Sequence, residues 1–490
     1  MADAVALAVY AILVGAGVLL VWRRPGAVLY AFIVGLALHN QVMAALYAAG
    51  VHGKALTVIQ AWKEVLLAVA LSRVAADALA TRKLPFRPGF VDALSLFFAG
   101  FVVVYALAPQ GPLDGAAGSR AIVYALRDDL VPVAAFFLGR SLLLRGRDLR
   151  RLAWTLVGTG ALVAAVGLVE QATVSLDDWA RSGVVGWYRH QGFRYHGARN
   201  LPENFVFNTG NEQHLVRRLV STFLSPLGSA YLLVVTLVAL GAGALRRPRI
   251  AVPVALVCAA GLLFTFTRAA LLALAFGLCA LAALRRRAWL IGAAVVTVAV
   301  TAGWASAFPH VAPRDHWSRA DLAYQRHQAR LHGGVRGGAA SPSEPSLHSH
   351  LTNLKAGLRT LRDHPQGFGL GNSGQAAART GIKIQAGEST YTQLGVDTGV
   401  GGMVAFIAWS LALLVGLVRS AERSGRAGSA AAACFAAILA IAVQTDVLGI
   451  PWLSYCVWSL AGALLVPAPV SEPALERRPA VSPQTPPAEA

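Results

Sequence analysis

Apolar runs of 17 to 25 residues recur along almost the whole chain, and they constrain the fold more than any other feature. Runs of this length cross a bilayer as helices. Only 14% of the 490 residues are charged, whereas a soluble domain carries roughly 25%, and the mean hydropathy is +0.56. The sequence therefore predicts an all-α fold, a polytopic transmembrane helical bundle.

The apolar runs predict about thirteen spans, within a range of 12 to 14. The first run has Arg23 and Arg24 behind it and no basic residue before it, which is typical of an uncleaved span with its amino terminus outside. The thirteen spans are expected at 4–21, 26–49, 55–75, 92–108, 128–144, 152–171, 219–244, 251–266, 269–284, 288–306, 390–418, 428–445 and 450–467.

Basic residues lie in every second short loop, and this alternation predicts the orientation of the bundle. Short loops rich in Lys and Arg face the cytoplasm. With that phase, two long polar segments, 172–217 and 307–389, fall on the outer face. We expect residues 1–467 to form a single transmembrane domain with these two external loops, and the Pro-, Ala- and Glu-rich stretch 468–490 to be a disordered cytoplasmic tail.

The second external loop is basic and rich in histidine. It contains ten Lys or Arg, five Asp or Glu, and seven His. Long loops cross the membrane largely regardless of charge, so topology does not explain these basic residues. They suit an anionic partner such as a phosphate or diphosphate; attraction to anionic lipid headgroups is the alternative.

Within this loop, leucines at 351, 354, 358 and 361 predict an amphipathic helix with Ser349 as its N-cap. The helix is expected to end at His364, before Pro365, and a Gly-rich turn follows at 367–374. Such a turn allows the backbone to approach a phosphate, although on spacing alone it is more often only a turn.

Three ionisable residues occur at the outer ends of predicted spans, namely Arg218, Arg268 and Glu388. Charged groups at membrane depth are costly unless they are paired or bind a ligand, so three on one side predict a shared polar cavity. The alternative is a set of arginines that extend to lipid headgroups. Lys63 and Glu64 in the third span, with Arg73, either line the same cavity or neutralise one another.

Several common site motifs are absent from the sequence. It contains no P-loop, no HExxH and no Asp-rich pair that would hold a metal-bound diphosphate. The four cysteines all fall inside apolar runs, so we expect no disulfide, zinc site or thiol catalysis. A metal-independent site, in which arginines take the place of the cation, fits this pattern, and no cofactor is expected.

Four segments, taken in order, resemble the O-antigen ligase/polymerase family. They are RRLVSTFLSPLGSAYLL, FTFTRAALLALAFG, LKAGLRTLRDHPQGFGLGNSG and GESTYTQLGVDTGVGGMVAFI, and they span roughly residues 215–420. The resemblance implies an integral membrane glycosyltransferase that takes a glycan from undecaprenyl diphosphate outside the membrane and joins it to an acceptor hydroxyl, without a nucleotide sugar or a metal.

The resemblance also implies residue roles. The two functional arginines of the family match Arg218 and Arg268, which would hold the diphosphate as it leaves. Ligases of the family place a histidine at the start of the span after the large loop, as base for the acceptor hydroxyl; this chain has Glu388 there. A carboxylate can act as that base if burial raises its pKa. The difference favours a polymerase over a ligase.

Further residues near these segments are candidates for substrate binding. Tyr391 lies one helical turn after Glu388 and could orient it or stack on a sugar; the others are Arg217, Arg359, Arg362 and His364. The expected partners are a lipid-linked oligosaccharide donor, a glycan acceptor, membrane lipids and a chain-length regulator or flippase, with no nucleic acid. Two alternatives stay open: a ligase onto a lipid or protein acceptor, and a polytopic transporter or flippase.

Overall fold

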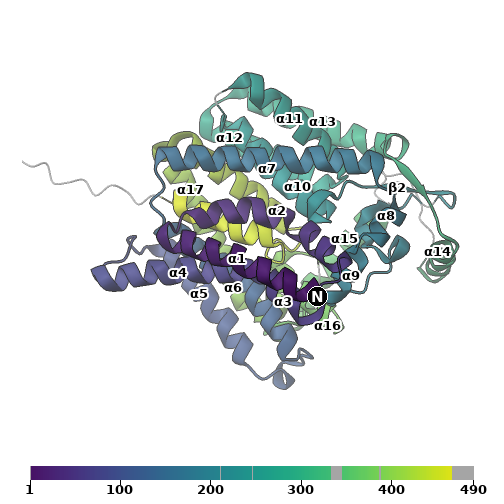
Figure 1. Ribbon diagram of the computed structural model, residues 1–490, viewed down its shortest axis with the longest axis horizontal. Coiled ribbons are helices and arrows are strands. Elements are labelled where there is room, and N and C mark those ends of the chain that lie inside the picture. The colour runs from purple at the N-terminus through teal and green to yellow at the C-terminus, as the bar shows by residue number, and fades with distance from the viewer. Residues whose placement is uncertain (1, 210, 246, 333–344, 386–387, 466–490) are drawn as a thin grey trace, which may run out of the picture.

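The computed structural model describes residues 2–209, 211–245, 247–332, 345–385 and 388–465, and it is a bundle of long helices (Figure 1). Each predicted span overlaps at least one helix over its described residues. The bundle helices are α1 (Ala2–Arg23), α2 (Ala27–Ala48), α3 (Gly53–Gln60), α4 (Trp62–Thr81), α5 (Phe90–Leu107), α6 (Ser119–Ser141), α7 (Gly146–Thr173), α10 (Pro226–Gly241), α11 (Pro248–Phe264), α12 (Arg268–Arg285), α13 (Ala288–Val311), α17 (Thr390–Ala442) and α18 (Trp458–Leu464).

The helices differ from the prediction in detail at two places. The predicted span 55–75 corresponds to two helices, α3 and α4, with a bend of 40° between them at Ala61. The predicted spans 390–418 and 428–445 both overlap α17, whose backbone leaves helical geometry at Gly399 and at Gly425. A π-helical turn, Leu453–Val457, leads into α18.

Fewer than thirteen of the described helices are long and apolar enough to cross a membrane. Among the described residues, eight helices are long and apolar enough to cross a membrane, or up to nine if the bent pair is one span. The helices α10, α11 and Leu453–Leu464 are shorter, and α6 carries charged residues along its length. The protein is therefore a multi-pass membrane protein with an all-α bundle, and a count of thirteen spans stays a prediction.

The outer surface of the bundle is apolar, as a lipid environment requires. Large hydrophobic side chains such as Leu13, Phe97 and Val295 are more than half exposed. A soluble protein rarely exposes contiguous apolar surface of this kind, whereas in a bilayer these side chains face hydrocarbon. The interior is closely packed: α6 approaches α18 at Gly139 and Gly462, where an added Cβ would lie 2.0 Å from the Ser459 carbonyl oxygen and 2.3 Å from that of Phe136.

A buried ion pair joins three helices at one end of the bundle. The Nε of Arg140 on α6 donates to Asp92 of α5 at 2.9 Å, and both side chains are about 5% exposed. The two other guanidinium nitrogens donate to the carbonyl oxygens of Leu465 (2.8 Å) and Arg87 (3.0 Å). The charge is thus fully hydrogen-bonded, which is the condition under which a buried ion pair is tolerated.

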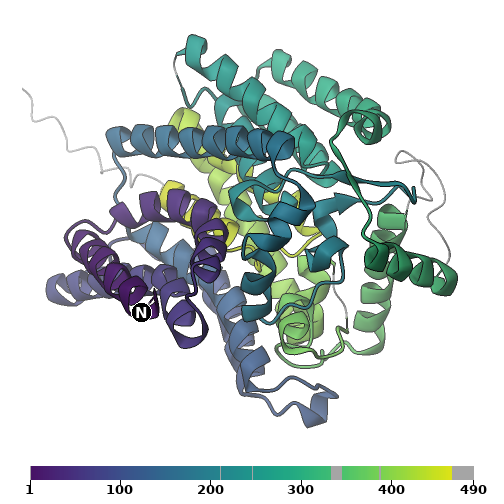
Figure 2. The same ribbon diagram turned by 45° about the vertical axis from the view of Figure 1, so that its right-hand side comes forward.

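The two long polar segments form a cap at the opposite end, which we call the loop end (Figures 1 and 2). They contain α8 (Leu176–Arg181), α9 (Val184–His190), β1 (Val206–Phe207), β2 (His214–Arg217), β3 (Arg314–His316), α14 (Arg319–His332), α15 (Pro345–Asp363) and α16 (Gly374–Thr380). Strands pair antiparallel in the order β1-β2-β3, with Leu215 opposite Asp315, so one small sheet joins the two segments. The end with the short basic loops is called the basic end below.

The amphipathic helix predicted around 351–361 is confirmed as α15, but its predicted start is wrong. The helix begins at Pro345, so Ser349 lies inside it and is not its N-cap. Proline fits the first turn because it lacks the N–H that would be left unpaired there. The predicted tail, 468–490, lies outside the described residues.

Candidate active site

A polar cavity of about 680 Å³ opens at the loop end of the bundle. Its walls come from α2, α4, α6, α9, α15 and α16, from the beginnings of α10 and α17, and from the connection 444–452. This size lies within the range of roughly 300–1,000 Å³ that is usual for ligand sites. The cavity therefore draws side chains from segments that are far apart in the sequence.

Glu388 lines this cavity together with His350, and the two side chains form a pair. The imidazole Nδ1 of His350 donates a hydrogen bond to Oε2 of Glu388. Asn353, on the next turn of α15, donates to Oε1 at 2.7 Å. α15 supplies both donors, and Glu388 comes just before α17. The packing of α15 on α17 therefore determines the geometry of the His350–Glu388 pair.

The packing of α15 on α17 depends on two small residues. An added Cβ at Gly357 of α15 would lie 3.1 Å from Thr392, and one at Gly395 of α17 would lie 2.4 Å from Leu361. The helices therefore approach closely, with Leu361 buried in the contact. This contact holds His350 above the start of α17.

The pKa of Glu388 does not move in the direction expected from burial. Burial by itself would raise the pKa, but the hydrogen bonds from His350 and Asn353 outweigh burial and lower it. Glu388 is then a carboxylate at neutral pH and a weak proton acceptor. The condition under which Glu388 could act as the base, a pKa raised by burial, is therefore not met, because the two donors on α15 lower the pKa.

Among the described residues, four cations line the cavity: Lys63, Arg120, Arg127 and Arg379. Arg379 is half-buried. Its guanidinium lies between the rings of Tyr124 (5.5 Å) and Phe193 (4.9 Å). One nitrogen, Nη2, donates to Gln375 at 3.3 Å, while Nε is buried without a hydrogen-bond partner in the described part of the chain. Burial lowers the pKa of Arg379, yet an arginine starts so far above neutrality that it remains charged.

Two of the other cations already have carboxylate partners. Lys63 lies 3.3 Å from Glu64, and Arg127 lies 2.7 Å from Asp128 and 3.9 Å from Glu64. Lys63 thus lines the cavity with Glu388 and is neutralised by Glu64, whereas Glu64, Arg218 and Arg268 are not among the lining residues. Arg73 does not take part, since it pairs with Asp77 near Trp22.

The fourth cation, Arg120, donates through Nε to the hydroxyl of Tyr124 at 3.0 Å. Together with Arg379, it leaves positive charge at the cavity that no carboxylate contacts among the ion pairs of the described residues. Asp446 is an acidic residue of the same cavity lining. Burial raises its pKa to about 6, and the backbone N–H groups of Leu448 and Gly449 donate hydrogen bonds to it, each at 3.0 Å.

Arg218 and Arg268 lie together at another place, the break between α11 and α12. Arg218 donates through Nε to the Thr265 carbonyl oxygen (2.8 Å) and through Nη2 to the Thr267 hydroxyl (3.1 Å). Arg268 begins α12, with its guanidinium 5.5 Å from the Phe266 ring centroid. Both are at the loop end, but neither is among the residues that line the 680 Å³ cavity with Glu388.

The other predicted binding residues also lie outside the cavity lining. Arg217 donates to the carbonyl oxygens of Val174 and Gln171, and the Tyr391 hydroxyl donates to the Leu439 carbonyl oxygen at 3.2 Å. On α15, Arg359 is exposed and Arg362 pairs with Asp363 at 2.9 Å. His364 contacts the ring of Phe368. Their roles in substrate binding stay predictions.

The Gly-rich turn at 367–374 packs against protein. Gly371 has a φ of +93°, and an added Cβ there would lie 2.8 Å from the Ala121 backbone of α6. Asn372 fixes the turn, because its side chain accepts from the Ala116 N–H (2.7 Å) and its own N–H donates to Asp397 (3.0 Å). The turn therefore packs between α6 and α17, which agrees with the interpretation of the segment as a structural turn.

Sequence reasoning missed Arg120, Arg127 and Arg379 as cavity residues. Arg379 is one of ten basic residues in its loop, and no motif separates it from the others. Arg127 directly precedes the predicted span 128–144, in the sequence RDD, so its position at the membrane boundary was the one available signal. Among the described residues, no group of three or more His, Cys, Asp or Glu could hold a metal ion.

The fold and the site together define a class: a multi-pass membrane protein with a cation-rich cavity at one end, beside a carboxylate–imidazole pair. The family model Wzy_C, described as O-antigen ligase, matches residues 253–407, and this match confirms the resemblance to the O-antigen ligase/polymerase family. Together with the helices that are long and apolar enough to cross a membrane, this match indicates a membrane glycan-processing protein. No curated protein matches the sequence.

Proposed function

We propose that the protein is a metal-independent, inverting glycosyltransferase that uses an undecaprenyl-diphosphate-linked glycan as donor, on the outer face of the cytoplasmic membrane. The observation that carries this proposal is that the Glu388–His350 pair and the cations Arg120 and Arg379 line one cavity. A base for an acceptor hydroxyl and a positive surface for a diphosphate are the two requirements of such a transfer.

In the proposed step, Nε2 of His350, the ring nitrogen that does not contact Glu388, takes the proton of the acceptor hydroxyl. The acceptor oxygen then forms a bond to the anomeric carbon, the bond from that carbon to the diphosphate breaks, and the diphosphate leaves as an anion. Glu388 keeps the imidazole in the tautomer with the proton on Nδ1 and stabilises the imidazolium that forms. Its lowered pKa suits this supporting role better than the role of the base itself.

Two sets of arginines are candidates for the leaving diphosphate. The family resemblance assigns it to Arg218 and Arg268, while the cavity offers Arg379, which has a buried Nε without a partner among the described residues. Guanidinium groups suit this role because they donate in pairs to phosphate oxygens. Substitution of each arginine in turn by alanine, with turnover of a lipid-linked oligosaccharide as the readout, distinguishes the two sets.

We further propose that the transfer extends a surface polysaccharide, as a polymerase does, with a ligase as the alternative. The test incubates the purified full chain with a lipid-linked oligosaccharide. Longer glycans on the carrier would support the polymerase, and glycan on a separate lipid or protein acceptor would support the ligase. Movement of the oligosaccharide across liposomes without a new glycosidic bond would contradict both and indicate a transporter.

A further inference from the structure

A second kind of cavity lies at the basic end, far from the candidate active site. It has a volume of about 820 Å³ and lies between α7, the end of α10, the second half of α17 and α18. Its wall is apolar and built from leucines and small residues, among them Leu152, Ala239, Ala431 and Leu460. Small side chains leave a slot of the kind that an extended hydrocarbon chain can fill.

Three arginines lie on the rim of this slot: Arg150, Arg247 and Arg426. All three are exposed, and no carboxylate is among the residues that line the cavity. Within the described part of the chain, none of the three takes part in an ion pair; Arg426 only approaches the Gly243 carbonyl oxygen at 3.5 Å. Three like charges around one opening repel one another, so an anion at this position is favourable.

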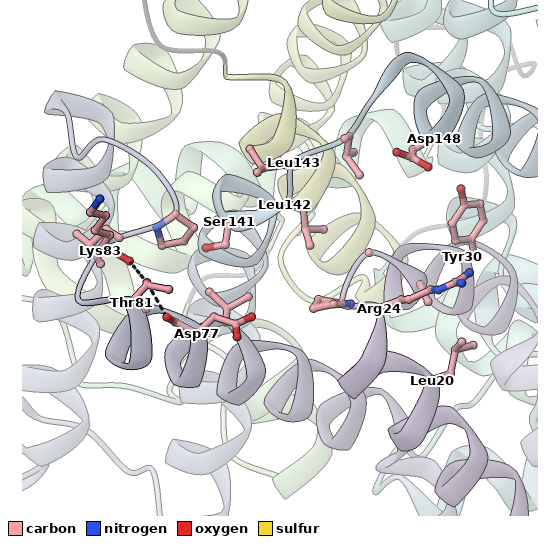
Figure 3. A pocket seen from close by; sticks show the side chains of 18 of the residues that line it. Leu20, Arg24, Tyr30, Asp77, Thr81, Lys83, Ser141, Leu142, Leu143 and Asp148 are labelled. Atoms are coloured by element: carbon pink, nitrogen blue, oxygen red, sulfur yellow. Dashed lines mark hydrogen bonds between the residues drawn. The ribbon is translucent and has the colours of Figure 1, made fainter.

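A neighbouring cavity at the same end provides a contrast (Figure 3). Its volume is about 720 Å³, and its cations are Arg24, Lys83 and Arg151. The carboxylates of Asp77 and Asp148 line it as well, as Figure 3 shows. Two carboxylates therefore lie beside the three cations of that cavity, whereas no carboxylate is among the residues that line the 820 Å³ slot.

We propose that the slot binds an anionic glycerophospholipid of the leaflet at the basic end. Arg150, Arg247 and Arg426 would bind the phosphate, and an acyl chain would fill the apolar slot. Basic pockets between transmembrane helices recognise anionic headgroups in this way, and guanidinium groups donate in pairs to phosphate oxygens. This site is independent of the proposed glycosyl transfer, since it lies at the other end of the bundle.

The test compares lipids bound to the purified full chain by native mass spectrometry. The probe is dioleoylphosphatidylglycerol, in competition with an equal amount of dioleoylphosphatidylcholine. We expect the wild type to retain phosphatidylglycerol preferentially. Each basic residue near an anionic headgroup contributes roughly a fivefold change in affinity, so the triple variant Arg150→Gln, Arg247→Gln, Arg426→Gln should bind it on the order of 100-fold more weakly.

Two further variants keep the proposal falsifiable. The matched control, Arg24→Gln, Lys83→Gln, Arg151→Gln, removes the same charge from the cavity of Figure 3 and should weaken binding by less than about fivefold. The variant Ala431→Trp keeps the arginines but fills the slot, and should also lose the lipid. Equal losses in the two triple variants, unchanged binding in Ala431→Trp, or no preference of the wild type for phosphatidylglycerol would each overturn the proposal.

Discussion

Replacement of Arg379 by alanine is the sharpest test of the cavity as the diphosphate site. The guanidinium is held between two aromatic rings, with Nη2 on Gln375 and Nε free of any partner in the described chain. One or two charge-assisted hydrogen bonds to the leaving group, at roughly 1.5–3 kcal/mol each, are therefore available. A loss of about 3–4 kcal/mol corresponds to a fall in kcat/KM of roughly 10²- to 10³-fold.

A lysine at the same position should retain part of the activity. It keeps the positive charge but loses the planar, paired donors and the contact with both rings, so we expect a fall of roughly 10- to 50-fold, which corresponds to the loss of about one such bond. The assay follows the turnover of purified lipid-linked oligosaccharide at subsaturating concentration. Size-exclusion chromatography and thermal unfolding verify that each variant is folded.

The matched control is Arg181→Ala on α8, whose side chain is 75% exposed and pairs only with Asp178. Its activity should stay within about twofold of the wild type, as is usual for an exposed pair. Activity of Arg379→Ala within threefold of the wild type would refute the assignment of the diphosphate to this cavity. If Arg218→Ala and Arg268→Ala then lost activity, the break between α11 and α12 would be the diphosphate site instead.

Three further predictions concern the pair and the bundle. His350→Ala and Glu388→Gln should each reduce turnover by roughly 10²-fold or more. The double variant should be little worse than either single variant, because the two residues act as a unit. Additive losses, or an equal loss in the exposed control His327→Ala, would argue against the pair. Since the pKa of Glu388 is lowered in the folded state, its contribution to stability is present above the unfolded value of about 4.3 and is lost as the pH falls through the folded pKa. The protection factors of the α15 amides, which are corrected for the intrinsic pH dependence of exchange, should therefore be constant from about pH 6 to 8 and fall only in stronger acid. Glu388→Gln should abolish this fall, and a fall near neutrality would contradict the assignment. Asp92→Ala should reduce the free energy of unfolding by about 3–5 kcal/mol, because it leaves Arg140 buried and without its carboxylate. Asp77→Ala, in an exposed pair, should reduce it by less than about 1 kcal/mol. Equal shifts in Tm for these two variants would show that the buried pair does not contribute more to stability than the exposed pair.

The helices were predictable because each predicted span is a local property of the sequence. Apolar runs long enough to cross a bilayer are visible without knowledge of any neighbour, and the heptad-like leucines of α15 are equally local. The boundaries were less accurate, as the start of α15 at Pro345 shows, because a helix end depends on capping and on what lies next to it.

The site was predictable only in part, since its geometry depends on contacts between distant segments. Glu388 stood out because it is an acid at the start of a span, and it does line the cavity. Arg379 reaches the same cavity only because α16 packs beside α6, where Tyr124 lies, and no local pattern announces that contact. The direction of the pKa shift of Glu388 could not be predicted for the same reason: its two hydrogen-bond donors are 35 and 38 positions away in the chain.

The small sheet at the loop end can be completed only late in the synthesis of the chain, because its third strand comes from the second polar segment. β1 and β2 lie in the first polar segment, but β3, which completes the sheet, begins at Arg314, after roughly a hundred further residues and four more helices. At about 5–20 residues per second, the first segment would wait on the order of 5–20 seconds for its partner strand. During that interval the edge of β2 is open, and Arg199 lacks two of its carboxylate partners, Asp315 and Asp321. The cap that encloses the cavity can therefore form only after α10 to α13 have been inserted.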